Sequence, residues 1–174
     1  MATLRTFFAL WPDAAARDVM AAMARDVARR AGGRAPRPEN HHLTLAFVGE
    51  VAVRRIDALM RIGAAASRSV APFMLTLDRL GEFHHTGIVW LGADTLPAPL
   101  ERLVRALRDG LAAEGFPVER RRYRAHVTLV RRCGTVAPAT IAPVAWRVER
   151  VTLMASELLP AGSRYRELAA WPIG

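Results

Sequence analysis

A four-residue motif occurs twice in the sequence, and this repeat restricts the fold more than any other feature. Residues 42–45 read HLTL and residues 126–129 read HVTL, so both fit H-x-T-L at a separation of 84 residues (126 − 42). The chain contains only 5 histidines in 174 residues, so two such copies are improbable by chance. A fold for this chain must therefore hold two equivalent segments in equivalent places.

The elements around the two motifs come in the same order. Strands are expected at 3–10, 41–48, 73–80, 87–92, 124–130, 146–158 and 164–170, and helices at 14–31, 53–68 and 97–113. A shift of 84 residues places the first helix on the third and one motif strand on the other. This order predicts an α+β fold of two pseudo-symmetric lobes, with antiparallel sheets flanked by helices and a central cleft that carries the H-x-T-L strands. Only a Pro/Ala-rich loop near 136–145 interrupts the pattern, so residues 1–174 are expected to form a single bilobal domain.

Strand geometry explains the spacing within each motif. Successive side chains of a strand point to opposite faces, so His42 and Thr44 share one face while the leucines between and after them share the other. His126 and Thr128 are arranged in the same way. If a pseudo-twofold axis relates the two halves, two imidazoles and two hydroxyls meet across one cleft.

Two imidazoles in one cleft are suited to phosphodiester chemistry. Imidazole has an unperturbed pKa of about 6.5, so it can take or give a proton near neutral pH. One on each side of a phosphate can act as base and acid, and threonine hydroxyls can donate hydrogen bonds to the phosphate oxygens. A single motif would be read most simply as a packed strand histidine; the matched pair favours a shared catalytic site.

The composition excludes several other classes. All 25 basic residues are Arg and the formal net charge is +9, which favours a phosphate-bearing partner. The absence of Lys excludes a lysyl-nucleotide intermediate, a pyridoxal phosphate Schiff base and a Walker-type phosphate loop. Cys133 is the single cysteine, and His84 and His85 have no further ligands at useful spacing, so no metal site is expected. The sequence has no signal peptide and no apolar run long enough for a membrane helix, so we expect a cytoplasmic protein without membrane contact.

Segments spread over nearly the whole chain resemble one family. They are RTFFALWP at 5–12, RPENHHLTLAFVGE at 37–50, GIVWLG at 87–92, RRYRAHVTLVRR at 121–132 and SELLPAGSRYRELAAWPIG at 156–174. With these segments the sequence resembles the two-histidine (2H) phosphoesterases, and among them the RNA 2′,3′-cyclic phosphodiesterases formerly named 2′-5′ RNA ligases. It departs from the family's usual pattern at His41, where an apolar residue is common, and at 82–85, where an Arg-Pro-containing loop is common.

The resemblance implies an activity and a role for each motif residue. The activity is metal-independent opening of an RNA 2′,3′-cyclic phosphate to a 2′-phosphate, without a cofactor. By the family's pattern, His42 would donate a proton to the leaving 3′ oxygen and His126 would accept one from water. Thr44 and Thr128 would hold the phosphate, and Arg131 would steer or clamp it. The partner would be RNA or an oligonucleotide that ends in a 2′,3′-cyclic phosphate, and we expect a monomer.

Two alternatives remain open at this point. Within the enzyme class, the protein could catalyse reversible 2′-5′ RNA ligation or hydrolyse another small cyclic phosphate. From a different class, it could be a non-catalytic RNA-binding module that uses a basic cleft. The two intact His/Thr pairs favour an enzyme, because a binding module has no need of two titratable acid/base groups.

Other residues are assigned to solvent or to packing. The arginines at 120–122 and the tyrosine after them are expected to form a solvated charge run rather than an RNA contact. Phe7, Phe47 and Trp90 are expected in the core, and Tyr165 is expected to pack rather than to face the cleft.

Overall fold

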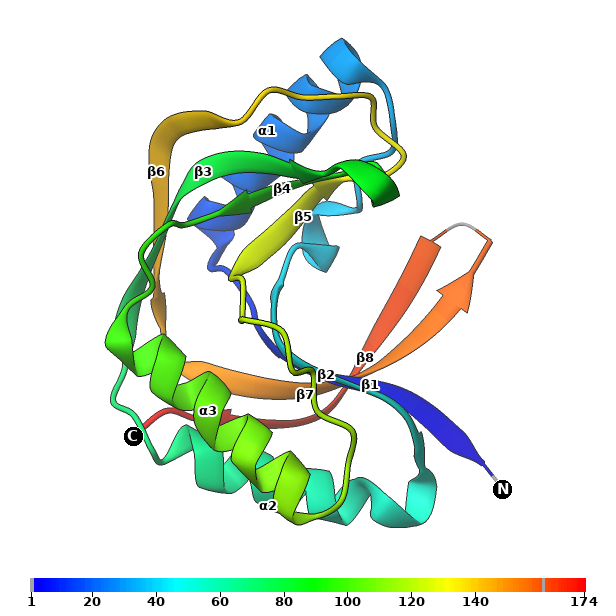
Figure 1. Cartoon of the computed structure of the whole chain (residues 1–174), viewed down its shortest axis with the longest axis vertical. Helices are drawn as coiled ribbons and strands as arrows, with labels where there is room; N and C mark the ends of the chain where they lie inside the picture. The colour runs from blue at the N-terminus through cyan, green and yellow to red at the C-terminus, as the bar shows by residue number, and fades with distance from the viewer. Residues whose placement is uncertain (1, 161) are drawn as a thin grey trace.

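A computed structural model of the chain describes residues 2–160 and 162–174. These residues contain eight strands and three α-helices (Figure 1). The strands are β1 (Thr3–Leu10), β2 (Leu43–Ala52), β3 (Phe73–Phe83), β4 (Ile88–Gly92), β5 (His126–Val130), β6 (Ala139–Val148), β7 (Arg150–Leu159) and β8 (Gly162–Pro172). The helices are α1 (Ala14–Ala31), α2 (Ile56–Ser67) and α3 (Ala98–Ala113). No helix in this part of the chain is long and apolar enough to cross a membrane.

The strands form one antiparallel sheet in the order β6-β3-β4-β5-β2-β1-β7-β8. This order is pseudo-symmetric about its centre, where the two motif strands β5 and β2 lie side by side. Among the described residues, Leu43 with Val127 is the one pair that joins these two strands. Figure 1 shows β3, β4, β5 and β6 in the upper lobe and β1, β2, β7 and β8 in the lower lobe. The expected α+β fold with two pseudo-symmetric lobes is confirmed, and its two sheet halves are joined through the motif strands.

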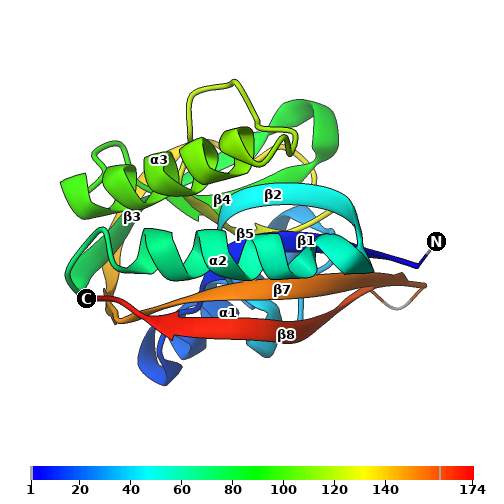
Figure 2. The same cartoon turned by 90° about the horizontal axis from the view of Figure 1, so that it is seen from below.

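The helices begin, end and pack as their sequences indicate. The Asp13 side chain caps α1 by accepting a hydrogen bond from the Ala16 N–H at 2.8 Å, and Gly32, at a φ of 73°, ends the helix. α1 packs against β5 and β6, which belong to the other half of the sheet, while α3 packs against β2. α2 lies beside α3 and contacts β7 and β8 (Figure 2). Each helix thus packs against strands from the other half of the chain.

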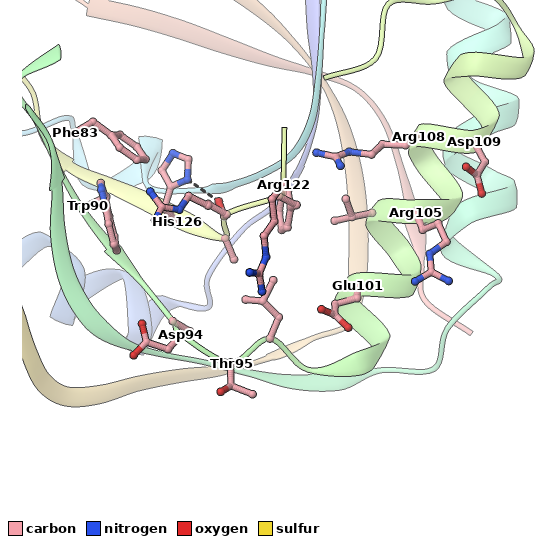
Figure 3. A pocket seen from close by; sticks show the side chains of 16 residues that line it. Phe83, Trp90, Asp94, Thr95, Glu101, Arg105, Arg108, Asp109, Arg122 and His126 are labelled. Atoms are coloured by element: carbon pink, nitrogen blue, oxygen red, sulfur yellow. Dashed lines mark hydrogen bonds between the residues drawn. The ribbon is translucent and has the colours of Figure 1, made fainter. Parts of the chain in front are cut away.

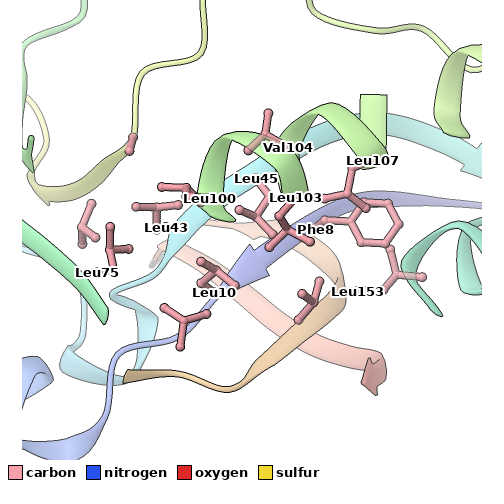
Figure 4. Packing of buried hydrophobic residues seen from close by; sticks show 14 of the residues in the cluster. Phe8, Leu10, Leu43, Leu45, Leu75, Leu100, Leu103, Val104, Leu107 and Leu153 are labelled. Carbon is pink, nitrogen blue, oxygen red and sulfur yellow. The ribbon is translucent and has the colours of Figure 1, made fainter. Parts of the chain in front are cut away.

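One hydrophobic core connects the motif strands to the helices (Figure 4). Leu43 and Leu45 of β2 and Val127 and Leu129 of β5 are at most 1% exposed. α3 packs against β2 and adds five buried side chains to this core, which are Leu100, Leu103, Val104, Leu107 and Leu111. Each fully buried aliphatic side chain contributes about 1.5–3 kcal/mol relative to exposure. This burial fixes which face of each motif strand is left for chemistry.

The expected strand at 146–158 is wrong in its boundaries. The structure has two strands there, β6 from Ala139 and β7 from Arg150, with Glu149 between them. The expected loop at 136–145 is therefore partly strand. β6 is an edge strand that pairs only with β3, and an edge strand tolerates Pro143 because the missing N–H is not needed by a second neighbour.

The expected burial of Phe47 is also wrong, because its side chain is 50% exposed. The pairing of β1 with β2 shifts register between Phe8 and Ala9, so Leu45 has no direct partner. Such a bulge moves the following side chains to the other face. Val48 is buried in place of Phe47, and the Arg5 guanidinium lies over the exposed ring at 4.9 Å from its centre.

Candidate active site

The register of the two motif strands brings their polar side chains to one face of the sheet. The antiparallel pairing sets His42 across from Thr128 and His126 across from Thr44. All four side chains are half-buried, whereas the apolar residues that alternate with them are buried. The two His/Thr pairs therefore lie next to the residue pair that joins β2 to β5.

The imidazole of His42 lies among three aromatic rings. Its centre is 5.1 Å from that of Phe7, 5.0 Å from that of Trp11 and 5.1 Å from that of Tyr165. Its Nδ1 lies 2.7 Å from the Asn40 carbonyl oxygen, two residues earlier in the chain. Tyr165 was expected to pack rather than to face the cleft; it packs against this imidazole and so belongs to the site.

Burial controls the protonation of His42. Desolvation lowers the pKa of His42 from 6.5 to about 4, because the aromatic rings replace the water that would stabilise the cation. The hydrogen bond to the Asn40 carbonyl opposes this change, and the nearby charge of Arg131 and proximity to His126 add to it. In the absence of an anion, His42 is neutral at pH 7.

His126 has the same backbone contact in a less enclosed setting. Its Nδ1 lies 2.8 Å from the Arg124 carbonyl oxygen, again two residues earlier. One ring, Phe83, meets it edge-on at 5.2 Å between ring centres. Desolvation lowers the pKa of His126, the Arg124 carbonyl raises it, and the Arg131 and Arg124 charges lower it.

Both backbone contacts select the same tautomer. A carbonyl oxygen only accepts hydrogen bonds, so the Nδ1 of each imidazole carries a proton and donates it. Nε2 is then the atom of each ring that exchanges a proton with a ligand. The site therefore offers two Nε2 atoms and two hydroxyls on one face of the sheet.

Arg131 lies directly after β5 and is exposed. Its charge lowers the pKa of both His42 and His126. Its backbone exchanges two hydrogen bonds with Arg34, at 2.7 and 2.9 Å. This close approach requires Gly33, because a Cβ at that position would lie 2.7 Å from the Arg131 carbonyl oxygen. The structure thus fixes the Arg131 backbone beside Arg34 and places its charge close enough to act on both imidazoles.

Two side chains that sequence reasoning did not assign to the site hold its backbone. The Asn40 side chain donates to the Ser163 carbonyl at 3.1 Å and ties the His42 segment to β8. The Tyr123 hydroxyl donates to the Thr44 carbonyl at 2.8 Å, and burial raises the pKa of Tyr123, so it stays protonated. These contacts join residues far apart in the chain, so no local pattern announces them.

The other three histidines do not join the pair. His41 is 1% exposed, and its Nδ1 lies 3.1 Å from the Pro38 carbonyl oxygen. His84 contacts the Glu82 carboxylate at 2.5 Å, and His85 is exposed. In the described part of the chain, no group of three or more His, Cys, Asp or Glu side chains could hold a metal ion.

A groove of about 840 Å³ opens from the His126 side of the site (Figure 3). It runs between β4, α3 and the segment at 122–125. Its walls include Trp90, which was expected in the core, and Arg122, which was expected to be solvated only. His126 lines this groove, whereas His42, Thr44, Thr128 and Arg131 do not.

A pseudo-symmetric sheet with two His/Thr pairs on adjacent central strands defines a two-histidine phosphoesterase. The chain belongs to the 2′-5′ RNA ligase superfamily, whose family model matches residues 11–158. The family expected from the sequence is therefore confirmed.

Relatives and solved structures agree with this membership. The chain is 35% identical to the RNA 2′,3′-cyclic phosphodiesterase of Escherichia coli over 146 residues, which cover 81% of this chain and 80% of that one. It is 31% identical to the RNA 2′,3′-cyclic phosphodiesterase of Thermus thermophilus, with 75% of this chain and 71% of the relative covered. The crystal structure of Escherichia coli LigT complexed with 3′-AMP superposes with a TM-score of 0.86 at 32% identity and covers 99% of both chains.

Proposed function

We propose that this protein hydrolyses the 2′,3′-cyclic phosphate ends of RNA to 2′-phosphomonoesters without a metal ion. The observation that carries the proposal is a pair of imidazoles on adjacent strands, both with Nδ1 held by a backbone carbonyl. Acid/base catalysis needs two proton-exchanging atoms on opposite sides of one phosphate. The activity named for the relatives supports the same reaction.

The site residues divide the reaction between them. Thr44 and Thr128 donate hydrogen bonds to the non-bridging oxygens, where negative charge builds up, and Arg131 compensates that charge. Nε2 of His126 accepts a proton from water as the water oxygen attacks phosphorus. The bond from phosphorus to the 3′ oxygen breaks, and Nε2 of His42 protonates that oxygen. The product carries a 2′-phosphate and a free 3′-hydroxyl.

The proposed acid role of His42 depends on the substrate's charge. In the free protein, burial holds His42 neutral at pH 7, because its pKa is lowered to about 4. A phosphodiester monoanion bound beside the imidazole favours the charged form and raises that pKa. Substrate binding thus draws in the proton that the leaving oxygen needs.

The whole chain, residues 1–174, is proposed to act as one bilobal phosphodiesterase domain, as a monomer in the cytoplasm. The two motif strands are neighbours in one sheet, so neither half supplies the site alone. The single Cys133 fits a reducing compartment.

The test is turnover of a 2′,3′-cyclic mononucleotide by the purified protein in excess chelator. We expect hydrolysis to continue and phosphorus NMR to show only the 2′-phosphate. A 3′-phosphate product would reverse the direction assigned to the two histidines. Activity that chelator abolishes and a divalent ion restores would contradict the metal-free mechanism.

A further inference from the structure

The strand that carries His126 is bound closely to one neighbour and loosely to the other. β5 pairs with β4 through four residue pairs, the first of which is Gly92 with His126. A Cβ on Gly92 would lie 2.8 Å from the Ala125 carbonyl oxygen, so these two strands are in close contact. With β2, within the described residues, β5 shares the pair Leu43 with Val127 alone. Strand pairing therefore does little to fix how far the two motif strands lie from each other.

β5 has one further connection to the first half of the chain at each end. After its last residue, Arg131 exchanges backbone hydrogen bonds with Arg34 at 2.7 and 2.9 Å. Before its first residue, the Tyr123 hydroxyl donates to the Thr44 carbonyl oxygen at 2.8 Å. His126 is that first residue. The position of its imidazole relative to β2 therefore depends on the Tyr123 end of the strand.

The Tyr123 side chain is itself held in place. Its ring packs against the hydrophobic core, and the Arg108 guanidinium of α3 lies 5.9 Å from the ring centre. The same guanidinium donates to the Arg121 carbonyl oxygen at 3.2 Å, which connects the segment before Tyr123 to α3. Burial raises the pKa of Tyr123, so the hydroxyl keeps its proton and remains a donor at neutral pH.

This hydrogen bond joins residues that serve different parts of the proposed reaction. The residue after Tyr123 is Arg124, whose carbonyl oxygen lies 2.8 Å from Nδ1 of His126. Thr44, on the other side of the bond, carries one of the hydroxyls proposed to hold the phosphate. A movement of Tyr123 away from β2 would therefore move the imidazole of His126 relative to the phosphate. A misplacement of about 1 Å can lower a rate by about 10²-fold.

We propose that Tyr123 is a positioning residue whose hydroxyl sets the distance between His126 and the phosphate held at Thr44. The inference rests on the proposed function and adds a residue that acts through its two neighbours. Without the hydroxyl, Thr44, Thr128 and Arg131 still contact the phosphate, but the base no longer meets the attacking water at the right distance. The loss should therefore affect kcat rather than KM.

The experiment removes one oxygen atom and keeps the ring, with the variant Tyr123→Phe. The matched control is Ser67→Ala, which removes another hydroxyl that donates to a backbone carbonyl, that of Ala64 at 3.0 Å. Ser67 is buried and is the last residue of α2, outside the site. We would measure kcat and KM for a 2′,3′-cyclic mononucleotide, and urea unfolding would show that each variant is folded in the assay buffer.

A second comparison places Tyr123→Phe in a protein that already carries His126→Ala. The slow turnover of this pair is measured as a single-turnover rate with enzyme in excess over the cyclic mononucleotide. No base remains to be misplaced in this background, so the loss of the hydroxyl should have little further effect. A purely structural role would lower turnover by the same factor in both backgrounds.

We expect Tyr123→Phe to lower kcat about tenfold and to change KM by less than about twofold. Ser67→Ala should match the wild-type protein in both constants. In the His126→Ala background, Tyr123→Phe should lower the rate by less than about twofold.

Three results would overturn the proposal. They are an unchanged kcat in Tyr123→Phe, an equal fall of kcat in Ser67→Ala, and an equal factor of loss with and without His126. A wild-type protein that turns over no cyclic phosphate, or a His126→Ala variant with near-normal turnover, would instead contradict the proposed function.

Discussion

Protonation of His42 should destabilise the folded protein, because three aromatic rings surround its imidazole. Burial lowers the pKa of His42 from 6.5 to about 4, and at about 1.36 kcal/mol per pKa unit the difference corresponds to about 3 kcal/mol. The unfolded chain, with a histidine pKa near 6.5, binds a proton between pH 6.5 and 4 when the folded protein does not. The contribution of the buried neutral imidazole to the free energy of unfolding is therefore complete above pH 6.5. It is lost as the pH falls towards 4.

Urea unfolding between pH 4.5 and 8, followed by tryptophan fluorescence, measures this loss. His42→Gln removes the titrating group. As the pH is lowered, the free energy of unfolding of this variant should therefore fall less than that of the wild-type protein, and the difference between the two falls should reach up to about 3 kcal/mol. His41 and His126 also have lowered pKa values and still titrate in both proteins, so they cancel in the comparison. His85→Gln, at an exposed position, is the matched control and should follow the wild-type curve. Parallel curves for His42→Gln and the wild-type protein would refute the reasoning.

The same titration tests how an anion acts on the site. Inorganic phosphate should raise the pKa of His42 when it binds between the two imidazoles, because the anion stabilises the imidazolium. NMR of the His42 ring should report a pKa near 4 without phosphate and a higher value at saturation. Binding should also restore stability at acid pH. A pKa that saturating phosphate leaves unchanged would remove the basis for His42 as the acid.

Further outcomes follow from the site geometry. His42→Ala and His126→Ala should each lower turnover of a cyclic mononucleotide by about 10²–10⁴-fold, and the double variant by far less than the product of the two effects; near-normal turnover in either single variant would exclude the pair. The profile of kcat/KM against pH should be bell-shaped with its maximum below pH 6.5, because both pKa values are lowered in the free protein; a maximum above pH 8 would contradict this. Gly33→Ala should destabilise the protein by about 1–3 kcal/mol, because the residue has a φ of 92° and its Cβ would meet the Arg131 carbonyl. Chemical denaturation and KM for the cyclic mononucleotide check this variant. An unchanged free energy of unfolding would show that the backbone at Gly33 leaves room for a Cβ beside the Arg131 carbonyl oxygen.

Local periodicity was enough to predict the elements that carry the chemistry. The alternation in H-x-T-L predicted which side chains point away from the core, and the burial of Leu43 and Val127 agrees. The spacing in α1 and Asp13 before it predicted the helix and its cap. These features depend on neighbours within a few residues of each other, and such patterns can be read directly from a sequence.

The surroundings of His42 could not be predicted in the same way. Phe7, Trp11 and Tyr165 come from β1, the segment after it and β8, and they meet only because β1, β7 and β8 are neighbours in the sheet. The exposure of Phe47 could not be predicted from the sequence either. A bulge in β2 moves its side chain out of the core. The position of a bulge depends on how the two strands pair, and the sequence of one strand alone does not show it.

The fold is nearly symmetric, yet the reaction needs two different histidines. Each motif gives its imidazole the same carbonyl contact and therefore the same tautomer. The difference arises outside the motifs, where His42 has three rings around it and His126 has one ring and an open groove. Enclosure lowers the pKa of His42 to about 4, so in the proposed mechanism its proton depends on a bound anion. His126 lines an open groove instead. The repeat thus supplies two equivalent imidazoles, and only the unequal segments around them distinguish His42, the proposed acid, from His126, the proposed base.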